Sequence, residues 1–322
     1  MNQLNTVNQV PLVRREHVVK NAEQCIAAGS KSFAVASRLF TAHTRESAMM
    51  LYAWCRHCDD MIDGQSLGHG QRTGNRQDGF KQLELLEQLT RRAIAGTPCS
   101  NPVFIGLAEV IERHEIPAHY PLAHLAGYRM DVENTFYPSL GSTLDYCWRV
   151  AGVVGVMMSL VMGRRDAATL DRASDLGMAF QLTNIARDVV EDAAIDRVYL
   201  PQEWLQEEGI HTTAQILEIQ SRASLSRVAT RLVDAAEPYY RSAGRGIGAL
   251  PLRSAWSVAT ARGVYRNIGQ NVKARGASAW DQRMHSSRAA KLWFVARGAA
   301  VALTAPMFPA SPRPSWLWTR PH

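Results

Sequence analysis

Apolar residues recur at spacings of three and four along most of this 322-residue sequence, and no other feature constrains the fold as strongly. This spacing places apolar side chains on one face of an α-helix. Alternating apolar and polar runs joined by hairpin turns, which would indicate β-strands, do not accompany it. The sequence therefore predicts an all-α fold, a bundle of long helices. The pattern covers residues 46–63, 80–95, 103–114, 144–163, 170–192, 213–234 and 254–275.

Two segments are apolar enough to be considered as membrane-spanning helices. Residues 150–163 are uncharged, but a spanning helix needs about 20 such residues. We therefore predict a buried core helix there. Residues 292–308 contain Arg297 and end among prolines, so this segment is expected to lie on a membrane surface rather than cross it.

Charge is unevenly distributed along the chain. Residues 241–322 hold 13 Lys and Arg but a single acid, Asp281, whereas the rest holds 23 basic and 28 acidic residues. A basic C-terminal part suits an anionic partner such as a membrane surface or a phosphorylated substrate. A basic surface that only steers the substrate is the alternative. Motifs for binding nucleic acid do not accompany the basic residues, so no nucleic acid is expected.

Polar side chains form a stripe on one predicted helix, in the stretch QLTNIARDVVED. Gln181, Asn184, Asp188 and Asp192 lie on one face, with Arg187 beside them. A solvated helix face is the simplest explanation of such a stripe.

A second stripe of matched spacing makes that explanation harder to keep. In YAWCRHCDDMID, Tyr52, Arg56, Asp59 and Asp63 again share a face. Each stripe ends in two carboxylates one helical turn apart and carries an arginine just before the first of them.

Four carboxylates brought together would repel one another unless a cation intervened. Mg²⁺ prefers oxygen ligands and commonly joins carboxylates to substrate phosphates, while an arginine guanidinium matches phosphate oxygens. The two stripes together favour a site for magnesium and diphosphate between two helices.

Five segments carry a resemblance to a known family. Residues 176–201 and 146–155 (YCWRVAGVVG) resemble the second and first signatures of the squalene and phytoene synthases. GSKSF (29–33), residues 52–63 and the end of the chain are similar to bacterial phytoene synthases in particular. The resemblance implies the class I isoprenoid synthase fold, a helical bundle around a central cavity that two aspartate-rich motifs face.

The resemblance also implies roles for individual residues. The metal ligands would be Asp59, Asp63, Asn184, Asp188 and Asp192, and the catalytic residues Tyr146, Arg56 and Arg187. The substrate-binding residues would be Ser30, Ser32, Phe33, Tyr52, Arg56, Gln181, Arg187, Arg197, Tyr265 and Arg283. The alignment of Arg283 needs a one-residue gap.

Two of these assignments have structural alternatives. Tyr146 is similar to the family tyrosine of the first half-reaction, but a tyrosine there would also serve as a hydrogen-bonding partner at a helix start. Arg197 and Tyr199 resemble a flap over the site, and ordinary loop anchoring is the alternative. Gly29 stands where some relatives carry a histidine.

The expected reaction is a Mg²⁺-dependent head-to-head condensation of two geranylgeranyl diphosphates. It proceeds via prephytoene diphosphate to 15-cis-phytoene, releases diphosphate and belongs to carotenoid biosynthesis. Mn²⁺ is the alternative ion, NADPH is not expected, and the sequence does not indicate whether a nucleotide activator is needed. Five cysteines without a disulfide framework favour a cytoplasmic setting, with peripheral membrane contact and other carotenoid enzymes as partners.

Three alternatives remain. A squalene or dehydrosqualene synthase would use farnesyl diphosphate, and a chain-elongating prenyltransferase would share the D-D-x-x-D pattern of residues 59–63. A non-catalytic assembly protein of this family would be expected to lose motif acids, all of which are present here.

Substrate length is predicted from Ser37, where a small residue one turn after Phe33 would leave room for the longer chain. Ala151, Gly155 and Ser159 recur every fourth residue, which fits either a cavity lining or close helix packing. The chain is divided into an N-terminal extension (1–19), the isoprenoid synthase domain (20–300) and a Pro-rich C-terminal tail (301–322).

Overall fold

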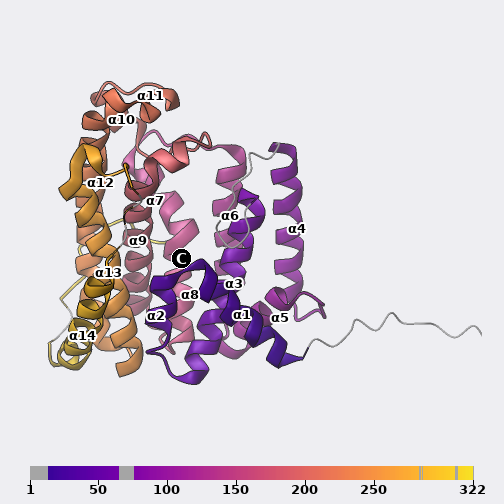
Figure 1. The fold of residues 1–322 in the computed structure, drawn as a ribbon. Coiled ribbons are helices and arrows are strands. Elements are labelled where there is room, and N and C mark those ends of the chain that lie inside the picture. Colours follow the sequence, from indigo (N-terminus) through magenta and orange to yellow (C-terminus); the bar gives the residue numbers. More distant parts are fainter. Residues whose placement is uncertain (1–13, 65–75, 283, 285, 309–310, 322) are drawn as a thin grey trace, which may run out of the picture.

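The protein is described by a computed structural model that covers residues 14–64, 76–282, 284, 286–308 and 311–321. These residues form helices and no strand, which confirms the all-α prediction (Figure 1). The α-helices are α1 (Arg15–Gly29), α2 (Lys31–Ser37), α3 (Ala42–Asp63), α4 (Arg76–Ile94), α5 (Pro102–His114), α6 (His119–Glu133), α7 (Leu140–Cys147), α8 (Val153–Val161), α9 (Ala167–Ala193), α10 (Gln202–Glu207), α11 (Thr213–Leu217), α12 (Arg222–Gly246), α13 (Leu252–Arg275) and α14 (Arg288–Thr304). The shorter turns are η1 (Trp148–Gly152), η2 (Ile219–Ser221), η3 (Ile247–Ala249), η4 (Gly276–Ser278) and η5 (Ala305–Met307).

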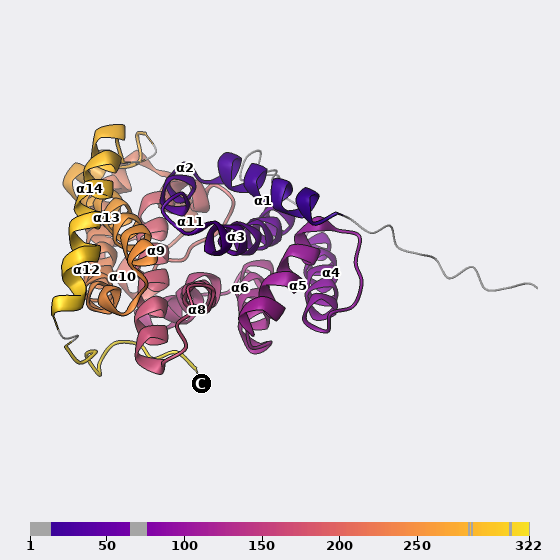
Figure 2. The same cartoon turned by 90° about the horizontal axis from the view of Figure 1, so that it is seen from below.

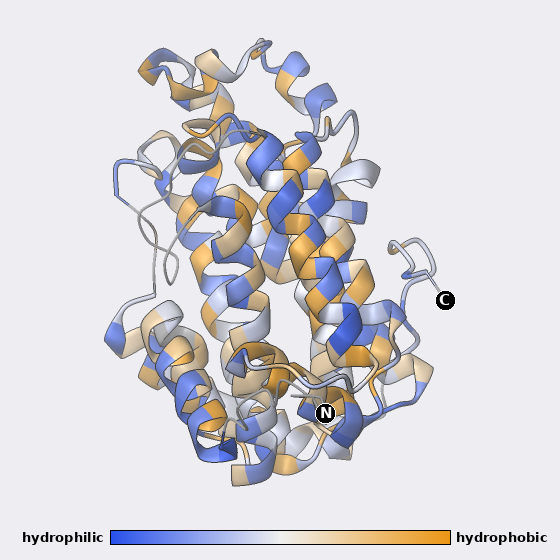
Figure 3. Cartoon of the chain, turned by 90° about the vertical axis from the view of Figure 1, so that its right-hand side faces the viewer, coloured by the Kyte–Doolittle hydropathy of each residue, from blue (hydrophilic) through white to orange (hydrophobic). Residues whose placement is uncertain are grey.

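The helices form two groups with α8 and α9 between them. In Figures 1 and 2, α3–α6 lie on one side and α12–α14 on the other. Each group has its own apolar core. One core is centred on α9 and α12, with Leu182 and Leu232 fully buried. The other joins α1, α3–α6 and α8 around Trp54 and Met157. Figure 3 shows apolar and polar residues interleaved on the same helices, as expected for amphipathic helices that pack on one face.

Local signals set the ends of the two helices that carry the stripes. Thr41 caps α3 by accepting a hydrogen bond from the backbone N–H of Thr44, and α3 ends at Gly64, whose φ of 60° favours glycine. Asp166 caps α9 in the same way through the N–H of Thr169. Each stripe therefore lies toward the C-terminal end of a long, well-defined helix.

The apolar segment 150–163 is part of the core, as predicted. Leu140–Val161 is the one helical run of the described residues that is long and apolar enough to cross a membrane, and 61% of its apolar window is buried inside the protein. Within it, η1 is a π-helical turn, and α8 packs against α9. Glycines allow this contact, because a Cβ at Gly155 would lie 2.2 Å from the carbonyl oxygen of Ala173, and one at Gly177 equally close to that of Ala151.

Two predicted features differ from the structure. The border drawn between residues 19 and 20 falls inside α1. The periodic stretch 213–234 is not one helix but α11, η2 and the start of α12, because Glu218 adopts an extended backbone (ψ 138°). The five glycines of residues 64–79 predict a loop; residues 76–79 instead begin α4, and residues 65–75 lie outside the described residues.

Candidate active site

A cavity of about 870 Å³ lies between the two groups of helices. Its walls come from α2, α3, α6, α8, α9 and α13. The C-terminal halves of α3 and α9 give one end its charged side chains. The other end is lined mainly by apolar residues, among them Phe40, Met158, Met162 and Leu250. The cavity thus has a polar and an apolar end.

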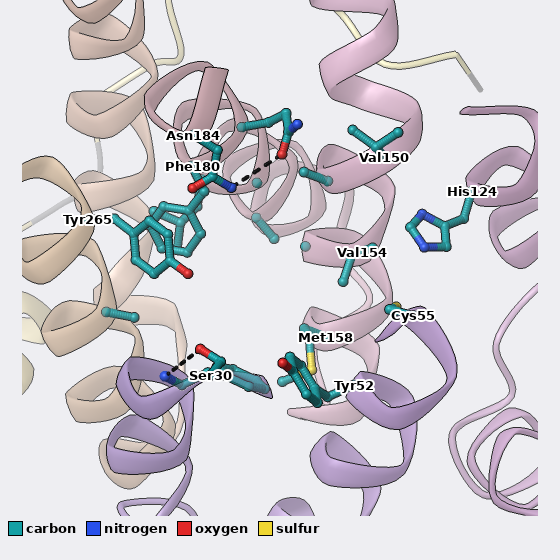
Figure 4. Close-up of a pocket in the computed structure, with 18 of the residues that line it drawn as sticks. Ser30, Tyr52, Cys55, His124, Val150, Val154, Met158, Phe180, Asn184 and Tyr265 are labelled. Atoms are coloured by element: carbon teal, nitrogen blue, oxygen red, sulfur yellow. Dashed lines mark hydrogen bonds between the residues drawn. The ribbon is translucent and has the colours of Figure 1, made fainter. Parts of the chain in front are cut away.

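Both predicted stripes line the polar end. From α3 the cavity receives Tyr52, Arg56, Asp59 and Asp63, and from α9 it receives Gln181, Asn184, Arg187, Asp188 and Asp192. Asp60, the middle acid of the first motif, does not line the cavity. Figure 4 shows the amide of Asn184 donating to Gln181, at 3.4 Å. The structure therefore brings together all of the stripe residues proposed from the sequence.

Arginines neutralise the carboxylates of both stripes. Arg56 Nη1 lies 2.5 Å from Asp59 Oδ2, and Arg187 donates through two nitrogens to Asp188. Arg197, in the loop after α9, donates to Asp63 at the end of α3 over 2.5 Å. This last pair joins the loop after α9 to the stripe on α3, so the loop predicted as a flap lies at the polar end of the cavity.

Asp131, on α6, is a site residue that the sequence analysis missed. Its carboxylate accepts hydrogen bonds from the hydroxyls of Tyr199 (2.9 Å) and Tyr146 (3.3 Å), whose rings stack with centroids 4.6 Å apart. His124, Tyr128 and Asp131 all line the cavity, at i, i+4 and i+7. That spacing repeats the one in the α3 stripe and could have revealed this third wall.

Burial raises the pKa of several of these acids. It raises the pKa of Asp131 to about 6 and, together with the charge of Asp63, that of Asp59 to about 7. Asp192 also has a pKa well above the usual range, because of burial first and the charge of Asp188 second. Arg197 opposes these shifts at Asp131 and Asp192. At Asp59 and Asp192 a neighbouring carboxylate adds to the effect of burial, so ionising all of these acids together is unfavourable without a cation.

A divalent metal fits this donor set. The side-chain amide oxygen of Asn184 (Oδ1) is buried and has no hydrogen-bond partner among the described residues. Oxygen donors on two facing helices, with carboxylates whose ionisation is unfavourable without a cation, suit a hard divalent ion. Within the described residues no three His, Cys, Asp or Glu side chains are already arranged as a metal cluster. Each stripe therefore supplies a pair of carboxylates, and substrate oxygens would have to complete the coordination.

The phosphate-binding residues proposed around α2 have structural roles as well. Ser30 Oγ caps α2 by accepting from the N–H of Phe33 at 3.2 Å (Figure 4). Gly29 lies against Tyr52, and a Cβ there would be 2.5 Å from the tyrosine hydroxyl. Glycine at this position thus makes room for the Tyr52 hydroxyl.

The remaining predicted residues differ in what the structure says of them. Tyr265 lines the cavity and stacks on Phe180, with centroids 4.2 Å apart. Ser32 lies in α2, but its side chain is outside what the structure describes, and Arg283 lies outside the described residues altogether. Ser37 is buried but does not line the cavity, whereas Phe33 and Phe40 on either side do. The proposed effect of Ser37 on substrate length is therefore not supported by direct contact.

Small residues line the middle of the cavity. Ala151, Gly155 and Ser159 all border it, and Gly155 also makes the close contact with α9. The two explanations offered for this spacing, cavity lining and tight helix packing, are therefore both correct.

Comparisons with known proteins point in one direction. Residues 26–290 match the family model described as squalene/phytoene synthase. The chain is 51% identical to a 15-cis-phytoene synthase of Pantoea ananas over 304 residues, 94% of this chain and 98% of the relative. It is 53% identical to a 15-cis-phytoene synthase of Enterobacter agglomerans over 293 residues, 91% of this chain and 99% of the relative.

Solved structures agree at the level of the fold. A dehydrosqualene synthase in complex with a ligand superimposes with a TM-score of 0.79 at 26% identity, covering 90% of this chain and 98% of the other. The squalene synthase HpnC from Alicyclobacillus acidocaldarius gives a TM-score of 0.69 at 24% identity, covering 81% and 96%.

Proposed function

The chain belongs to the squalene/phytoene synthase family, and from this membership we propose that it condenses two geranylgeranyl diphosphates to 15-cis-phytoene in carotenoid biosynthesis. The family uses prenyl diphosphates, so the substrate class and the need for a divalent metal follow from membership. One observation carries the proposal. Both aspartate-rich stripes line the same cavity, and the other end of that cavity is apolar.

The arginines are placed to exchange partners when substrate binds. Arg56, Arg187 and Arg197 now neutralise Asp59, Asp188 and Asp63, respectively. A divalent ion bound to these carboxylates would polarise the leaving diphosphate and help it depart as an allylic cation forms. The guanidinium groups, released from the carboxylates, can then turn to the diphosphate oxygens, which they fit bidentately.

The paired tyrosines suit the next step, in which a double bond of the second substrate attacks the cation. Closure of the cyclopropane of prephytoene diphosphate then requires loss of a proton. Tyr146 and Tyr199 both donate to Asp131, so their rings are held in fixed positions beside the polar end. Fixed hydroxyls and ring faces can stabilise positive charge and guide the proton away without reorganising during the reaction.

Magnesium is the ion we propose, with Mn²⁺ as the alternative. Carboxylate and amide oxygens are the ligands Mg²⁺ prefers, and it readily keeps substrate oxygens in its coordination shell. Activity in a chelated enzyme should return with Mg²⁺ and not with Zn²⁺; the opposite order would contradict the proposal.

Product analysis tests the function as a whole. Purified protein with Mg²⁺ is offered geranylgeranyl or farnesyl diphosphate, with and without NADPH. We expect a forty-carbon phytoene from the longer substrate without NADPH. A thirty-carbon product from the farnesyl substrate would instead support the squalene or dehydrosqualene alternative. Absence of turnover would favour the non-catalytic one.

We also propose peripheral membrane attachment, in the cytoplasm, through α14 and the turn that follows it. Large apolar side chains there are exposed, at 63–75% of their full area for Leu292, Trp293, Leu303, Met307 and Phe308. Arg288, Lys291 and Arg297 add positive charge on the same helix. An apolar and basic surface of this kind suits a bilayer containing anionic lipid.

Flotation with vesicles of zwitterionic and anionic lipid tests this surface. Replacing Leu292 and Trp293 with Asp should abolish binding of the full-length protein to anionic vesicles. Replacing Leu217 and Ile219, exposed on the distant α11–η2 segment, should leave binding unchanged. Equal binding by both variants would remove α14 from the attachment.

A further inference from the structure

Residues 311–321, the C-terminal strap, fold back onto the body of the protein. They contact the N-terminal half of α9, where the strap carbonyl of Ser311 and the side chains of Arg313 and Arg320 meet α9 residues. Leu317 is 2% exposed, and the backbone N–H of Trp318 donates to the hydroxyl of Tyr239 at 3.2 Å. The strap is therefore an ordered part of the fold, although it belongs to the segment that the sequence analysis set apart as a Pro-rich tail.

The strongest anchor of the strap is Arg313. It donates to both oxygens of Asp175, through Nε at 2.9 Å and Nη2 at 2.8 Å, and the Asp175 side chain is 0% exposed. Ser242 completes the pair by donating to the same carboxylate at 2.5 Å. A buried carboxylate needs such partners, so losing Arg313 would leave an uncompensated charge in the core.

Trp318 connects the strap to both halves of the molecule. Its ring packs against each of the two apolar cores and lies 5.9 Å from the ring of Trp148, between centroids. Arg320 adds a link on the other side by donating to Asp171 at 2.6 Å and to the hydroxyl of Tyr120 at 3.3 Å.

Arg172 brings the strap to the cavity wall. It lines the cavity 16 residues before Asp188, about 24 Å along α9 from the polar end. Its guanidinium donates to two carbonyls, that of Ser242 at 2.8 Å and that of Ser311 in the strap at 2.5 Å. Gly246 lets the aliphatic stem lie flat, because a Cβ there would be 2.7 Å from Cδ of Arg172.

We propose that the strap seals the apolar end of the cavity against water by holding Arg172 in place, which makes Arg172 a positioning residue for the reaction. This inference rests on the proposed function. The reaction passes through carbocations, and water that enters the cavity adds its oxygen to the cation and loses a proton, giving a prenyl alcohol in place of the hydrocarbon. The strap supplies one of the two carbonyls that keep the Arg172 guanidinium turned out of the apolar end.

The test compares products and fluorescence of full-length variants. Arg313→Gln should release the strap, and Arg172→Ala should remove the stem that lines the cavity wall. Each should raise the ratio of prenyl alcohol to hydrocarbon several-fold. Arg313→Gln should also shift tryptophan emission to the red as Trp318 becomes hydrated. Arg313→Lys, which keeps the charge but loses the double hydrogen bond, should give intermediate values. The exposed Arg241→Gln should keep both readouts at the wild-type values.

A double variant shows whether the strap acts through Arg172. Arg172→Met keeps an unbranched side chain against the cavity wall but has no guanidinium group that depends on the strap carbonyl of Ser311. Combined with Arg313→Gln, it should restore the wild-type product ratio while the emission stays red-shifted. Should Arg313→Gln fail to fold, Arg320→Gln replaces it, because this variant removes the links of the strap to Asp171 and Tyr120.

Two outcomes would overturn the proposal. One is an unchanged product ratio in Arg313→Gln despite red-shifted emission, which would reduce the strap to a stabilising element. The other is wild-type emission and products in Arg313→Gln, which would show that Arg313 does not hold the strap. A wild-type enzyme that makes neither hydrocarbon nor alcohol would contradict the proposed function, and the emission shift would then still report on the anchor.

Discussion

Asp131 organises one wall of the active site from a position deep in the protein. Two tyrosines donate to it, and burial raises its pKa to about 6. An ionised Asp131 accepts both hydrogen bonds, whereas a protonated one would compete as a donor. The arrangement therefore works best above the pKa of this carboxyl group.

Removing a tyrosine hydroxyl tests this wall. Tyr146→Phe and Tyr199→Phe each take one donor from Asp131, and we expect kcat to fall by about 10²-fold for Tyr146 and less for Tyr199. Tyr137→Phe is the matched control, because Tyr137 packs against both rings but its buried hydroxyl has no partner among the described residues. Equal losses in all three variants would indicate a packing effect rather than a role of the hydrogen bonds.

His124 makes the folded state sensitive to acid. It is 1% exposed, and burial lowers its pKa to about 4, against about 6.5 in the unfolded chain. Between these values the unfolded state binds the extra proton, so stability falls as the pH drops. At pH 5 the loss from this residue is about 2 kcal/mol relative to pH 7.

Thermal unfolding at pH 7 and pH 5 measures this loss. His124→Gln should lower stability at pH 7 but reduce its change with pH, while the exposed His119→Gln should change neither. A wild-type pH dependence in His124→Gln would assign the acid sensitivity to another group.

Helix α3 separates two acids that are adjacent in the sequence. Asp59 lines the cavity and Asp60 does not. Asp59→Asn should therefore abolish turnover and shift the Mg²⁺ titration to higher concentration, since one ligand to the ion is lost. Asp60→Asn should lower activity only modestly. A larger effect at Asp60 would place the metal on the other face of α3.

Glycines set how closely α8 approaches α9. Gly155→Ala and Gly177→Ala each force a Cβ against backbone, and we expect losses of about 1–3 kcal/mol or more in unfolding free energy. Gly141→Ala is the control, because its nearest neighbour would be 3.6 Å away. Chemical denaturation measures the unfolding free energy of each variant. Equal values for all three would show that α8 and α9 can move apart freely.

The elements that the sequence revealed are long helices whose apolar residues recur at regular helical spacing. The helices α3, α4, α5, α9 and α13 follow the periodic stretches within a few residues. Helix α6 was missed because it is buried on several sides, through residues such as Tyr120, His124, Leu125 and Tyr128, so no one face is apolar. Missing α6 meant missing Asp131.

Side-chain contacts between segments far apart in the chain could not be predicted from local sequence patterns. Asp175–Arg313 joins residues 138 apart, and Arg197–Asp63 joins residues 134 apart. The two stripes were found because each lies within a few helical turns. The strap was not, because a Pro-rich segment has no periodicity, and its order comes from partners elsewhere in the chain.

Ligand binding should stabilise the whole molecule, since the cavity lies between two cores that α8 and α9 separate. An unreactive diphosphate analogue added with Mg²⁺ should raise Tm in a concentration-dependent way, because it binds only the folded state. Mg²⁺ alone or the analogue alone should raise Tm less, because the ion and the diphosphate oxygens bind each other in the site. Additive effects of the two would contradict a shared site.

The cavity also predicts how the protein responds to hydrostatic pressure. Pressure favours unfolding in proportion to the internal voids that unfolding eliminates, and the apolar end of the cavity is such a space when no hydrocarbon fills it. The empty enzyme should therefore unfold at lower pressure than one filled by a long hydrocarbon. The apolar cavity that protects a carbocation from water should thus also lower the pressure at which the ligand-free enzyme unfolds.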